Sequence, residues 1–226
     1  KIKNICYYKN MVDLSKITKN GKAMYLAYDH GMEHGPEDLP NQSIDPQYIL
    51  NLAEKGNYTA IILQKGVAEK YYPPYKDKFP LIIKLNGKTR LVKGEALSKQ
   101  ICSVQEALDL GASAVGYTIY LGSKYEEDMI SEFGKISEEA HKSGIPAIGW
   151  MYPRGELIKD ETSPEITAYA ARIGLEIGAD IVKIKYSGSE EAFKEAVRAA
   201  GKTKVVLSGG AKTKNPGEFY EIVKSV

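Results

Sequence analysis

Two lysines stand two positions apart in the short apolar run ADIVKIKYSG, as Lys183 and Lys185. In a β-strand alternate residues point to opposite faces, so both amines would share one face while Val182 and Ile184 share the other. If the apolar face packs against outer helices, the lysines point inward, where lost hydration and a second cation favour the neutral amine. A neutral amine attacks a carbonyl carbon, which makes Lys183 a candidate Schiff-base nucleophile. The alternative, stronger for Lys185, is a lysine that extends out of the site to water.

Aromatic and basic side chains follow one another in the run PAIGWMYPRG. The same period of two places Ile148, Trp150 and Tyr152 on one face, with the indole and the phenol nearest the end of the strand. A pair of core aromatics is the simpler interpretation of this spacing. Arg154, which comes soon after, argues against it because a guanidinium seldom adjoins a buried core. The run therefore predicts a stacking surface, a proton-bearing phenol and an anion-binding arginine.

Carboxylates and imidazoles are concentrated in the run DHGMEHGP, which contains Asp29, His30, Glu33 and His34. A metal site is one interpretation, and capping of turns and helix starts beside glycine is another. No second supplier of soft ligands follows downstream, which disfavours a metal site. We expect no metal ion, and favour Asp29 as a general acid or base or as the carboxylate that orients a substrate hydroxyl.

A Gly-Gly turn follows the last β-branched run, in the sequence LSGGAKT. At Gly209 and Gly210 the absence of a side chain lets phosphate oxygens approach backbone N–H groups, and Lys212 adds a positive charge. A Gly-Gly pair is a weak signal by itself. Its place at a strand end favours a phosphate site, because the loops after the seventh and eighth strands of barrel enzymes frequently bind phosphate.

Taken together, these motifs supply a carboxylate, a phenol, an inward lysine and a phosphate cradle. Cleavage or formation of a carbon–carbon bond through an imine requires this set. The lysine attacks a ketone, the iminium acts as an electron sink, and the phenol or the carboxylate carries the proton.

Repeated βα units must position these groups. Short β-branched runs alternate with amphipathic stretches from about residue 22 onward, which is the pattern of a parallel sheet covered by helices. Parallel sheets place reactive groups at the carboxyl ends of their strands, where the motifs above lie. The predicted strands are Ala23–Asp29, Ala60–Leu63, Leu81–Leu85, Ala114–Thr118, Ala147–Met151, Ile181–Lys185 and Lys204–Ser208.

Helix boundaries are marked by capping residues at the start and by glycine at the end. The predicted N-caps are Asp45, Ser103, Ser163 and Asn215. The glycines predicted to turn the chain into the left-handed region after a helix are Gly56, Gly111, Gly144, Gly178 and Gly201.

The spacing of the strands fits either an open doubly wound sheet or a closed barrel. A glycine-rich nucleotide fingerprint is expected after the first strand of an open sheet, and the sequence there reads AYDHGMEHGP instead. We therefore predict an α/β fold, a TIM (β/α)8 barrel that forms a single domain over residues 1–226. The seventh strand is followed by one helix before Val226, so the eighth strand is expected to be absent from this chain.

Composition narrows the class of partner. The chain has 226 residues, 31 basic and 29 acidic, which suits one globular domain and gives no broad basic surface for nucleic acid or a membrane. The two cysteines, Cys6 and Cys102, lack metal-ligand spacing and indicate a reduced, cytoplasmic protein. The sequence contains no apolar run of bilayer length. We expect a small-molecule partner.

Several runs together resemble the archaeal-type class I fructose-1,6-bisphosphate aldolases, from about Ala23 to Val226. These runs are DHGMEHGP, LIIKLNGKT, GASAVGYTIYLGS, WMYPRG, AYAARIGLEIGADIVKIKYSG and LSGGAKT. The resemblance implies a TIM barrel that forms homo-oligomers, specifically decamers, uses no metal or other cofactor, and acts on a phosphorylated sugar. The reaction implied is cleavage of fructose 1,6-bisphosphate to dihydroxyacetone phosphate and glyceraldehyde 3-phosphate, a step of glycolysis and gluconeogenesis.

The resemblance also implies roles for individual residues. Lys183 would form the Schiff base, Tyr152 would donate the proton, and Asp29 would handle a substrate hydroxyl. Trp150 would pack beside the substrate. The remaining residues expected to contact substrate are His30, His34, Lys65, Arg154 and Lys185, with Ser208, Gly209 and Gly210 on one phosphate.

Three alternatives stay open. A sister branch, the 2-amino-3,7-dideoxy-D-threo-hept-6-ulosonate synthases of archaeal aromatic amino-acid biosynthesis, shares the lysine, the tyrosine and the aspartate. It typically has methionine where Trp150 stands and lacks the second EHG, so both features favour the aldolase. The others are a non-catalytic phosphate-binding barrel and a metal-dependent lyase built on DHGMEHGP.

Overall fold

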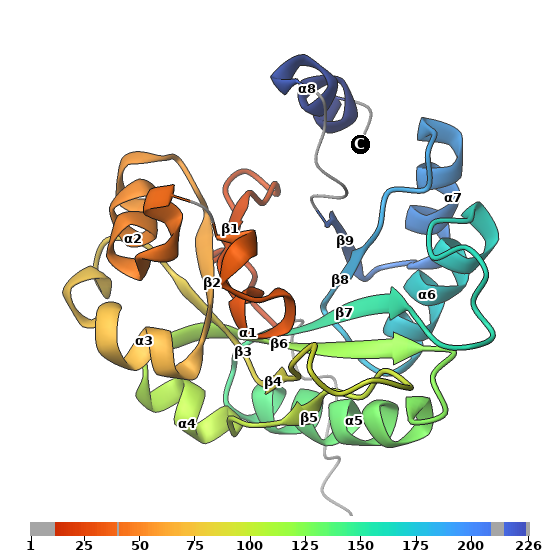
Figure 1. Cartoon of the computed structure of the whole chain (residues 1–226), viewed down its shortest axis with the longest axis horizontal. Helices are drawn as coiled ribbons and strands as arrows, with labels where there is room; N and C mark the ends of the chain where they lie inside the picture. The colour runs from red at the N-terminus through yellow and green to blue at the C-terminus, as the bar shows by residue number, and fades with distance from the viewer. Residues whose placement is uncertain (1–11, 40, 209–214, 225–226) are drawn as a thin grey trace, which may run out of the picture.

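The computed structural model describes residues 12–39, 41–208 and 215–224. Its main feature is one curled sheet of seven parallel strands, whose order in space follows their order in the chain (Figure 1). The strands are β1 (Tyr25–Ala27), β2 (Ala60–Gln64), β3 (Leu81–Lys84), β6 (Ala112–Leu121), β7 (Ala147–Pro153), β8 (Ile181–Ile184) and β9 (Lys204–Leu207). The seven strands predicted from the sequence are thus confirmed.

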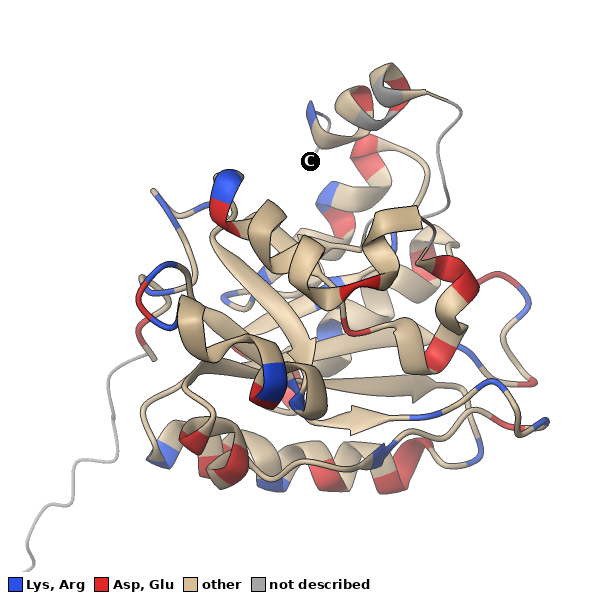
Figure 2. Ribbon diagram, turned by 60° about the vertical axis from the view of Figure 1, so that its left-hand side comes forward, with Lys and Arg blue, Asp and Glu red and all other residues tan. Residues whose placement is uncertain are grey.

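Helices lie around the outside of the curled sheet (Figure 1). They are α2 (Pro46–Lys55), α3 (Lys65–Tyr71), α4 (Val104–Asp109), α5 (Glu126–Lys142), α6 (Pro164–Glu176) and α7 (Glu190–Ala199). The last helix, α8 (Pro216–Lys224), stands apart from the sheet, beyond the end of β9 (Figure 1). The segment after β1 holds the short helix α1 (Gly31–His34) and the 3-10 turns η1 (Pro36–Asp38) and η2 (Asn41–Ile44), while η3 (Pro73–Tyr75) follows α3. Acidic and basic residues are interspersed along the outer helices rather than segregated by sign (Figure 2).

Two hydrophobic cores form on the two faces of the sheet. The outer core, between sheet and helices, includes Val182 and Ile184 of β8. The inner core lies inside the curl and includes Ile148 and Trp150 of β7. Because strand residues alternate between the faces, Lys183 projects to the inner side, as the period of two predicted.

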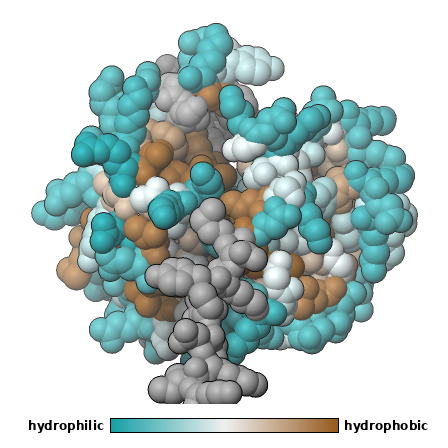
Figure 3. Space-filling model, turned by 180° about the vertical axis from the view of Figure 1, so that it is seen from behind, coloured by the Kyte–Doolittle hydropathy of each residue, from teal (hydrophilic) through white to brown (hydrophobic). Residues whose placement is uncertain are grey.

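Within the described residues the sheet is a TIM-barrel fold that lacks its eighth strand, as expected. β1 and β9 are the two ends of the strand order, and the ladders of the described residues run from one to the other without closing. Seen from behind, apolar side chains are visible between hydrophilic ones on this face of the molecule (Figure 3). Within the described residues, no helix has the length and apolar character needed to cross a membrane.

The predicted N-caps are confirmed by hydrogen bonds to free backbone N–H groups. Asp45 Oδ1 accepts from Gln47 N at 2.9 Å, and Ser103 Oγ accepts from Glu106 N at 3.0 Å. Ser163 Oγ accepts from Ile166 N at 3.3 Å. The fourth cap, Asn215, accepts from Glu218 N at 3.1 Å.

The glycine prediction holds at four positions and is wrong at one. Gly111, Gly144, Gly178 and Gly201 have positive φ. Gly56 has φ −88°, and a side chain there would meet the Tyr58 ring at 2.5 Å. Crowding, rather than a left-handed turn, therefore explains this glycine.

Two features of the fold were not predicted. A small antiparallel ladder pairs β4 (Asn86–Gly87) with β5 (Lys99–Gln100). The strand β6 also extends beyond its predicted bounds at both ends, whereas β1 is shorter than predicted and ends at Ala27. Asp29 consequently lies just beyond the end of β1 and not within it.

Candidate active site

A pocket of about 820 Å³ opens at the carboxyl ends of the strands. Residues from β1, β3, β7, β8 and β9, or directly after them, contribute side chains to it. The predicted site residues that line it are Asp29, His30, His34, Trp150, Tyr152, Arg154, Lys183, Lys185 and Ser208. The structure therefore brings together groups that are far apart in the sequence.

Lys183 lies beside Trp150, its partner in the β7–β8 register. The Nζ atom is 5.4 Å from the centre of the indole ring. Burial lowers the pKa of the amine and the Lys84 ammonium lowers it further, while Asp29 and Glu33 oppose these effects. Because the pKa is lowered, the amine is more readily present in its neutral, nucleophilic form.

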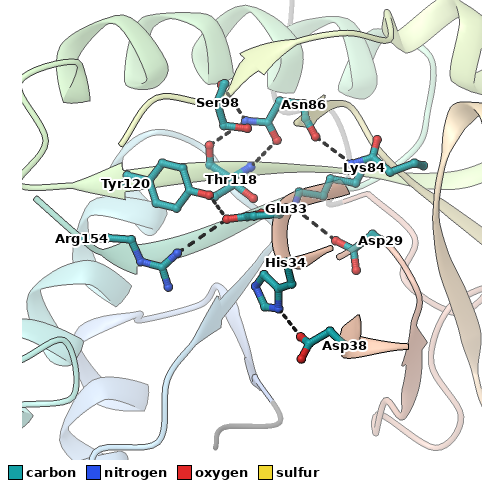
Figure 4. Close-up of polar contacts among 11 residues, drawn as sticks. Asp29, Glu33, His34, Asp38, Lys84, Asn86, Ser98, Thr118, Tyr120 and Arg154 are labelled. Atoms are coloured by element: carbon teal, nitrogen blue, oxygen red, sulfur yellow. Dashed lines mark hydrogen bonds and ion pairs between the residues drawn. The ribbon is translucent and has the colours of Figure 1, made fainter. Parts of the chain in front are cut away.

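The second cation near Lys183 is Lys84, which the sequence analysis did not select. Its Nζ atom lies 3.5 Å from Asp29 Oδ2 and 3.2 Å from Glu33 Oε2 (Figure 4). The side chain is 4% exposed. Although burial alone would lower its pKa, the two carboxylates raise the pKa of Lys84 above the usual value. Lys84 is thus held as a charged ammonium group.

Asp29 is the buried carboxylate between the two lysines. Burial alone would raise its pKa, but the neighbouring charges of Lys84 and Lys183 hold the pKa of Asp29 below its usual value. The carboxyl group is therefore ionised and accepts hydrogen bonds. This state suits a group that orients a substrate hydroxyl and accepts its proton.

Glu33 joins this cluster to the rim of the pocket. Its carboxylate accepts a hydrogen bond from the Tyr120 hydroxyl and lies 3.6 Å from Arg154 Nη1 (Figure 4). Burial would raise its pKa, but Lys84 and the hydrogen bond from Tyr120 lower it. Glu33 thus contacts two cations and a phenol. Among the described residues, no three His, Cys, Asp or Glu side chains are grouped so that they could hold a metal ion.

Tyr152 follows Trp150 on the inner face and completes the set around Lys183. Burial raises the pKa of its phenol, and the negative charges of Asp29 and Glu33 raise it further. A hydrogen bond with the Ser208 side chain opposes this shift. The phenol therefore keeps its proton, as a proton donor must.

Trp150 packs closely against a glycine on the neighbouring strand. The indole is 1% exposed, and a side chain at Gly116 would lie 1.5 Å from its Cζ3 atom. Gly116 is paired with Lys84 on its other side. The absence of a side chain at this position lets the indole lie beneath the site.

The other predicted contacts are distributed around the rim. The His34 Nδ1 atom lies 2.6 Å from Asp38 Oδ2, and the His30 ring centre is 5.6 Å from that of His34. Burial lowers the pKa of His30, which favours its neutral imidazole. Arg154 and Lys185 both contact Glu161, a residue that the sequence analysis did not select.

Lys65 is the one described candidate that the structure does not bring to this pocket. Lys65 is the first residue of α3, and its side chain is 39% exposed. Its Nζ atom lies 2.8 Å from Oε1 of Glu106. It lines a separate cavity of about 340 Å³. The family resemblance implied a substrate contact for Lys65, but its side chain pairs with Glu106. The candidates Gly209 and Gly210 lie outside the described residues.

A period-of-two signal was available for Lys84. In the run LIIK, Ile82 belongs to the inner core and Lys84 is two positions further along the same face. Tyr120 carries the same signal, because it is paired with Tyr152 in the register of β6 and β7. Glu161 carries none, because it lies in a loop and its partners Arg154 and Lys185 follow β7 and β8.

The curled parallel sheet and a buried lysine at its mouth define an aldolase of the imine-forming kind. Residues 23–225 match the DeoC/LacD family aldolase, and the chain belongs to this family.

The chain is also similar over most of its length to known proteins. The fructose-bisphosphate aldolase class 1 of Thermoproteus tenax is 51% identical over 210 residues, which are 92% of this chain and 79% of the relative. The protein of the same name from Halobacterium salinarum is 46% identical over 212 residues, 93% of this chain and 80% of the relative. A relative from Methanocaldococcus jannaschii, named fructose-bisphosphate aldolase/6-deoxy-5-ketofructose 1-phosphate synthase, is 40% identical over an alignment of 230 positions, which covers 95% of this chain and 73% of the relative.

A solved structure with a similar fold bears the same activity in its name. An archaeal fructose-1,6-bisphosphate aldolase has its catalytic lysine covalently bound to the carbinolamine intermediate of the substrate. It matches this chain with a TM-score of 0.90 and 50% identity, over 94% of this chain and 84% of the other.

Proposed function

We propose that this chain is a class I fructose-bisphosphate aldolase, a lyase that reversibly cleaves fructose 1,6-bisphosphate to dihydroxyacetone phosphate and glyceraldehyde 3-phosphate. The observation that carries the proposal is the Lys183 amine, whose pKa is lowered by burial and by a second cation in a pocket that also holds Asp29 and Tyr152. Relatives and a solved structure that bear this activity in their names, at 46–51% identity, support it.

In the proposed mechanism each described side chain has one task. The neutral amine of Lys183 attacks the C2 carbonyl and loses water to give an iminium ion, which accepts the electron pair when the C3–C4 bond breaks. Asp29 accepts the proton of the C4 hydroxyl as that oxygen becomes the aldehyde. Tyr152 supplies the proton that the enamine carbon takes up, and Trp150 packs beneath the carbon chain.

The proposed substrate contacts surround this centre. His30, His34, Arg154 and Lys185 line the pocket and would contact the substrate, and Ser208 with Gly209 and Gly210 would hold the phosphate nearest the ketone. We also propose a cytoplasmic homo-oligomer, a decamer by resemblance, working in glycolysis or gluconeogenesis. Light scattering coupled to size-exclusion chromatography measures the oligomer directly.

A reaction assay in two parts tests the function. Incubation with fructose 1,6-bisphosphate should yield triose phosphates, detected by a coupled dehydrogenase, with and without a chelator. Incubation with dihydroxyacetone phosphate and borohydride should add the reduced adduct to the peptide that contains Lys183. Triose phosphate formation without any covalent adduct would contradict the imine mechanism, and loss of activity in the chelator would support a metal-dependent lyase instead.

The synthase of archaeal aromatic amino-acid biosynthesis remains the second candidate only for the substrate. It would form the same imine on Lys183, so the trapping test does not separate the two. Cleavage of fructose 1,6-bisphosphate as measured above does, because that synthase joins different substrates.

A further inference from the structure

One carboxylate bridges two cations at the mouth of the pocket. Glu161 Oε1 lies 3.3 Å from Arg154 Nε, and its Oε2 atom accepts a hydrogen bond from the Lys185 ammonium. Arg154 directly follows β7 and Lys185 directly follows β8, and these two strands are neighbours. Both cations line the pocket. A single anion therefore connects the ends of two adjacent strands.

A phosphate group would make the same contacts. Guanidinium and ammonium groups both bind phosphate oxygens, and a dianionic phosphate is attracted more strongly than a carboxylate. Arg154 also faces Glu33 at 3.6 Å, but that carboxylate already contacts Lys84 and Tyr120. Glu161 is thus the anion that a phosphate arriving between Arg154 and Lys185 would have to replace.

The local backbone allows this replacement by a side-chain rotation alone. Asp160 Oδ1 accepts hydrogen bonds from Thr162 N at 2.9 Å and Thr162 Oγ1 at 2.7 Å. Ser163 caps α6 one residue further on. The turn is therefore fixed on both sides of Glu161, whose side chain is 31% exposed and borders on water.

We propose that Glu161 is a specificity-determining residue that stands in for the terminal phosphate of the substrate in the unliganded protein. This inference rests on the proposed aldolase function. A sugar with a phosphate at each end displaces Glu161 and bridges Arg154 and Lys185. A sugar phosphorylated only beside the ketone leaves Glu161 in place. Because Glu161 occupies the site in part of the molecules, the apparent affinity for the bisphosphate is the intrinsic affinity multiplied by the fraction in which Glu161 has left the site.

The variant Glu161→Gln tests this, because it keeps the size of the side chain and removes its charge. The KM for fructose 1,6-bisphosphate, relative to that for fructose 1-phosphate, should fall by about fivefold, the factor that an ion pair at the strong end of surface pairs represents. Inorganic phosphate should bind the unliganded variant more tightly by a similar factor in a calorimetric titration.

Two further variants make the result specific. Glu165→Gln removes an exposed carboxylate from the first turn of α6, and should change neither the KM ratio nor phosphate binding. The double variant Glu161→Gln/Lys185→Met should show neither the lower KM ratio nor the tighter phosphate binding, because the phosphate then lacks one of its two cations.

Opposite results overturn the inference. An unchanged or raised KM ratio, together with unchanged phosphate binding, would mean that Glu161 only orients Arg154 and Lys185. If the wild type cleaves neither sugar, the proposed function fails, and the calorimetric comparison of wild type and Glu161→Gln still decides whether Glu161 competes with phosphate.

Discussion

The ammonium group of Lys84 lies 3.5 Å from the carboxylate of Asp29, and both side chains are almost fully shielded from solvent. This contact gives the two lysines of the pocket, Lys84 and Lys183, different chemical roles. The pKa of Lys84 is raised by the carboxylates around it, whereas burial lowers the pKa of Lys183. Groups whose environments move their pKa values apart have different chemical roles. Lys84 keeps Asp29 ionised, and the lowered pKa of Lys183 makes the neutral, nucleophilic form of that amine more accessible.

Replacement of Lys183 by methionine should abolish covalent trapping of dihydroxyacetone phosphate by borohydride. The change keeps the approximate volume of the side chain and removes the amine, so the fold should persist. Mass spectrometry of the digested protein measures the adduct, and Lys204→Met, at an exposed position of β9, is the matched control. An adduct that persists in Lys183→Met on the peptide's other lysine, Lys185, would reassign the nucleophile.

The same variant should change how stability depends on pH. The folded-state pKa of Lys183 lies below the ordinary value of 10.5, so between these two pH values the unfolded chain binds a proton that the folded chain does not. Wild-type stability therefore rises with pH in that window. Lys183→Met lacks this dependence, so its melting temperature should exceed that of the wild type at pH 7.

The difference in melting temperature between Lys183→Met and the wild type should shrink as the pH approaches 10.5 and vanish above it. Other titrating groups are common to both proteins and cancel in the difference. Thermal unfolding at several pH values from 7 to about 11 measures this, with Lys204→Met as the exposed comparison. A difference between wild type and Lys183→Met that does not vary with pH would show that burial of this amine has no cost in the folded state.

The sequence predicted the residues that depend on local periodicity. Trp150, Tyr152 and Lys183 were placed correctly on the inner face because an alternation of two decides the direction of a strand side chain. The N-caps Asp45 and Ser103 could be predicted for the same reason, because each accepts a hydrogen bond from an N–H group two or three positions further along the chain. In these cases a residue and its structural reason lie within a few positions of each other.

Contacts between elements that are far apart in the chain could not be predicted from the sequence. Lys84 and Glu33 are 51 positions apart, and the pair forms only when α1 folds over the end of β3. Glu161 reaches Lys185 across 24 positions, from the segment between β7 and α6. Lys65 shows the opposite error, because the family resemblance implied a substrate contact but the side chain pairs with Glu106.

A methyl group on β6 should disturb the position of the indole. In Gly116→Ala the new carbon would lie 1.5 Å from Cζ3 of Trp150, so the ring must move in a packed core. Overpacking of this kind costs about 1–3 kcal/mol of unfolding free energy. The chain has one tryptophan, so its fluorescence spectrum reports the movement directly.

Gly134→Ala provides the control for Gly116→Ala. It lies within the helix α5 (Glu126–Lys142) with open space around the added carbon, and should stabilise the fold by about 0.5–1 kcal/mol. Equal unfolding free energies for Gly116→Ala and the wild type, with unchanged fluorescence, would contradict the close packing of Trp150 against β6.

Removal of a single oxygen atom should separate imine formation from turnover. An imine can form without the phenol of Tyr152, but release of the enamine requires a proton from a group within hydrogen-bond reach. Such a group contributes about a hundred- to ten-thousand-fold to the rate. Because burial and the nearby carboxylates raise the pKa of Tyr152, the phenol is protonated and able to donate. Tyr152→Phe should therefore lower kcat by a factor in that range.

The accumulated intermediate distinguishes this role from that of Asp29. Tyr152→Phe should still bind fructose 1,6-bisphosphate and build up a covalent adduct that borohydride traps on Lys183. Asp29→Asn should fail earlier, because the C4 hydroxyl then has no ionised acceptor and the carbon–carbon bond stays intact. Quenched-flow sampling followed by mass spectrometry identifies whether the trapped adduct carries six carbons or three. Six carbons in Asp29→Asn and three in Tyr152→Phe are expected, and the reverse assignment would exchange the roles of the two residues.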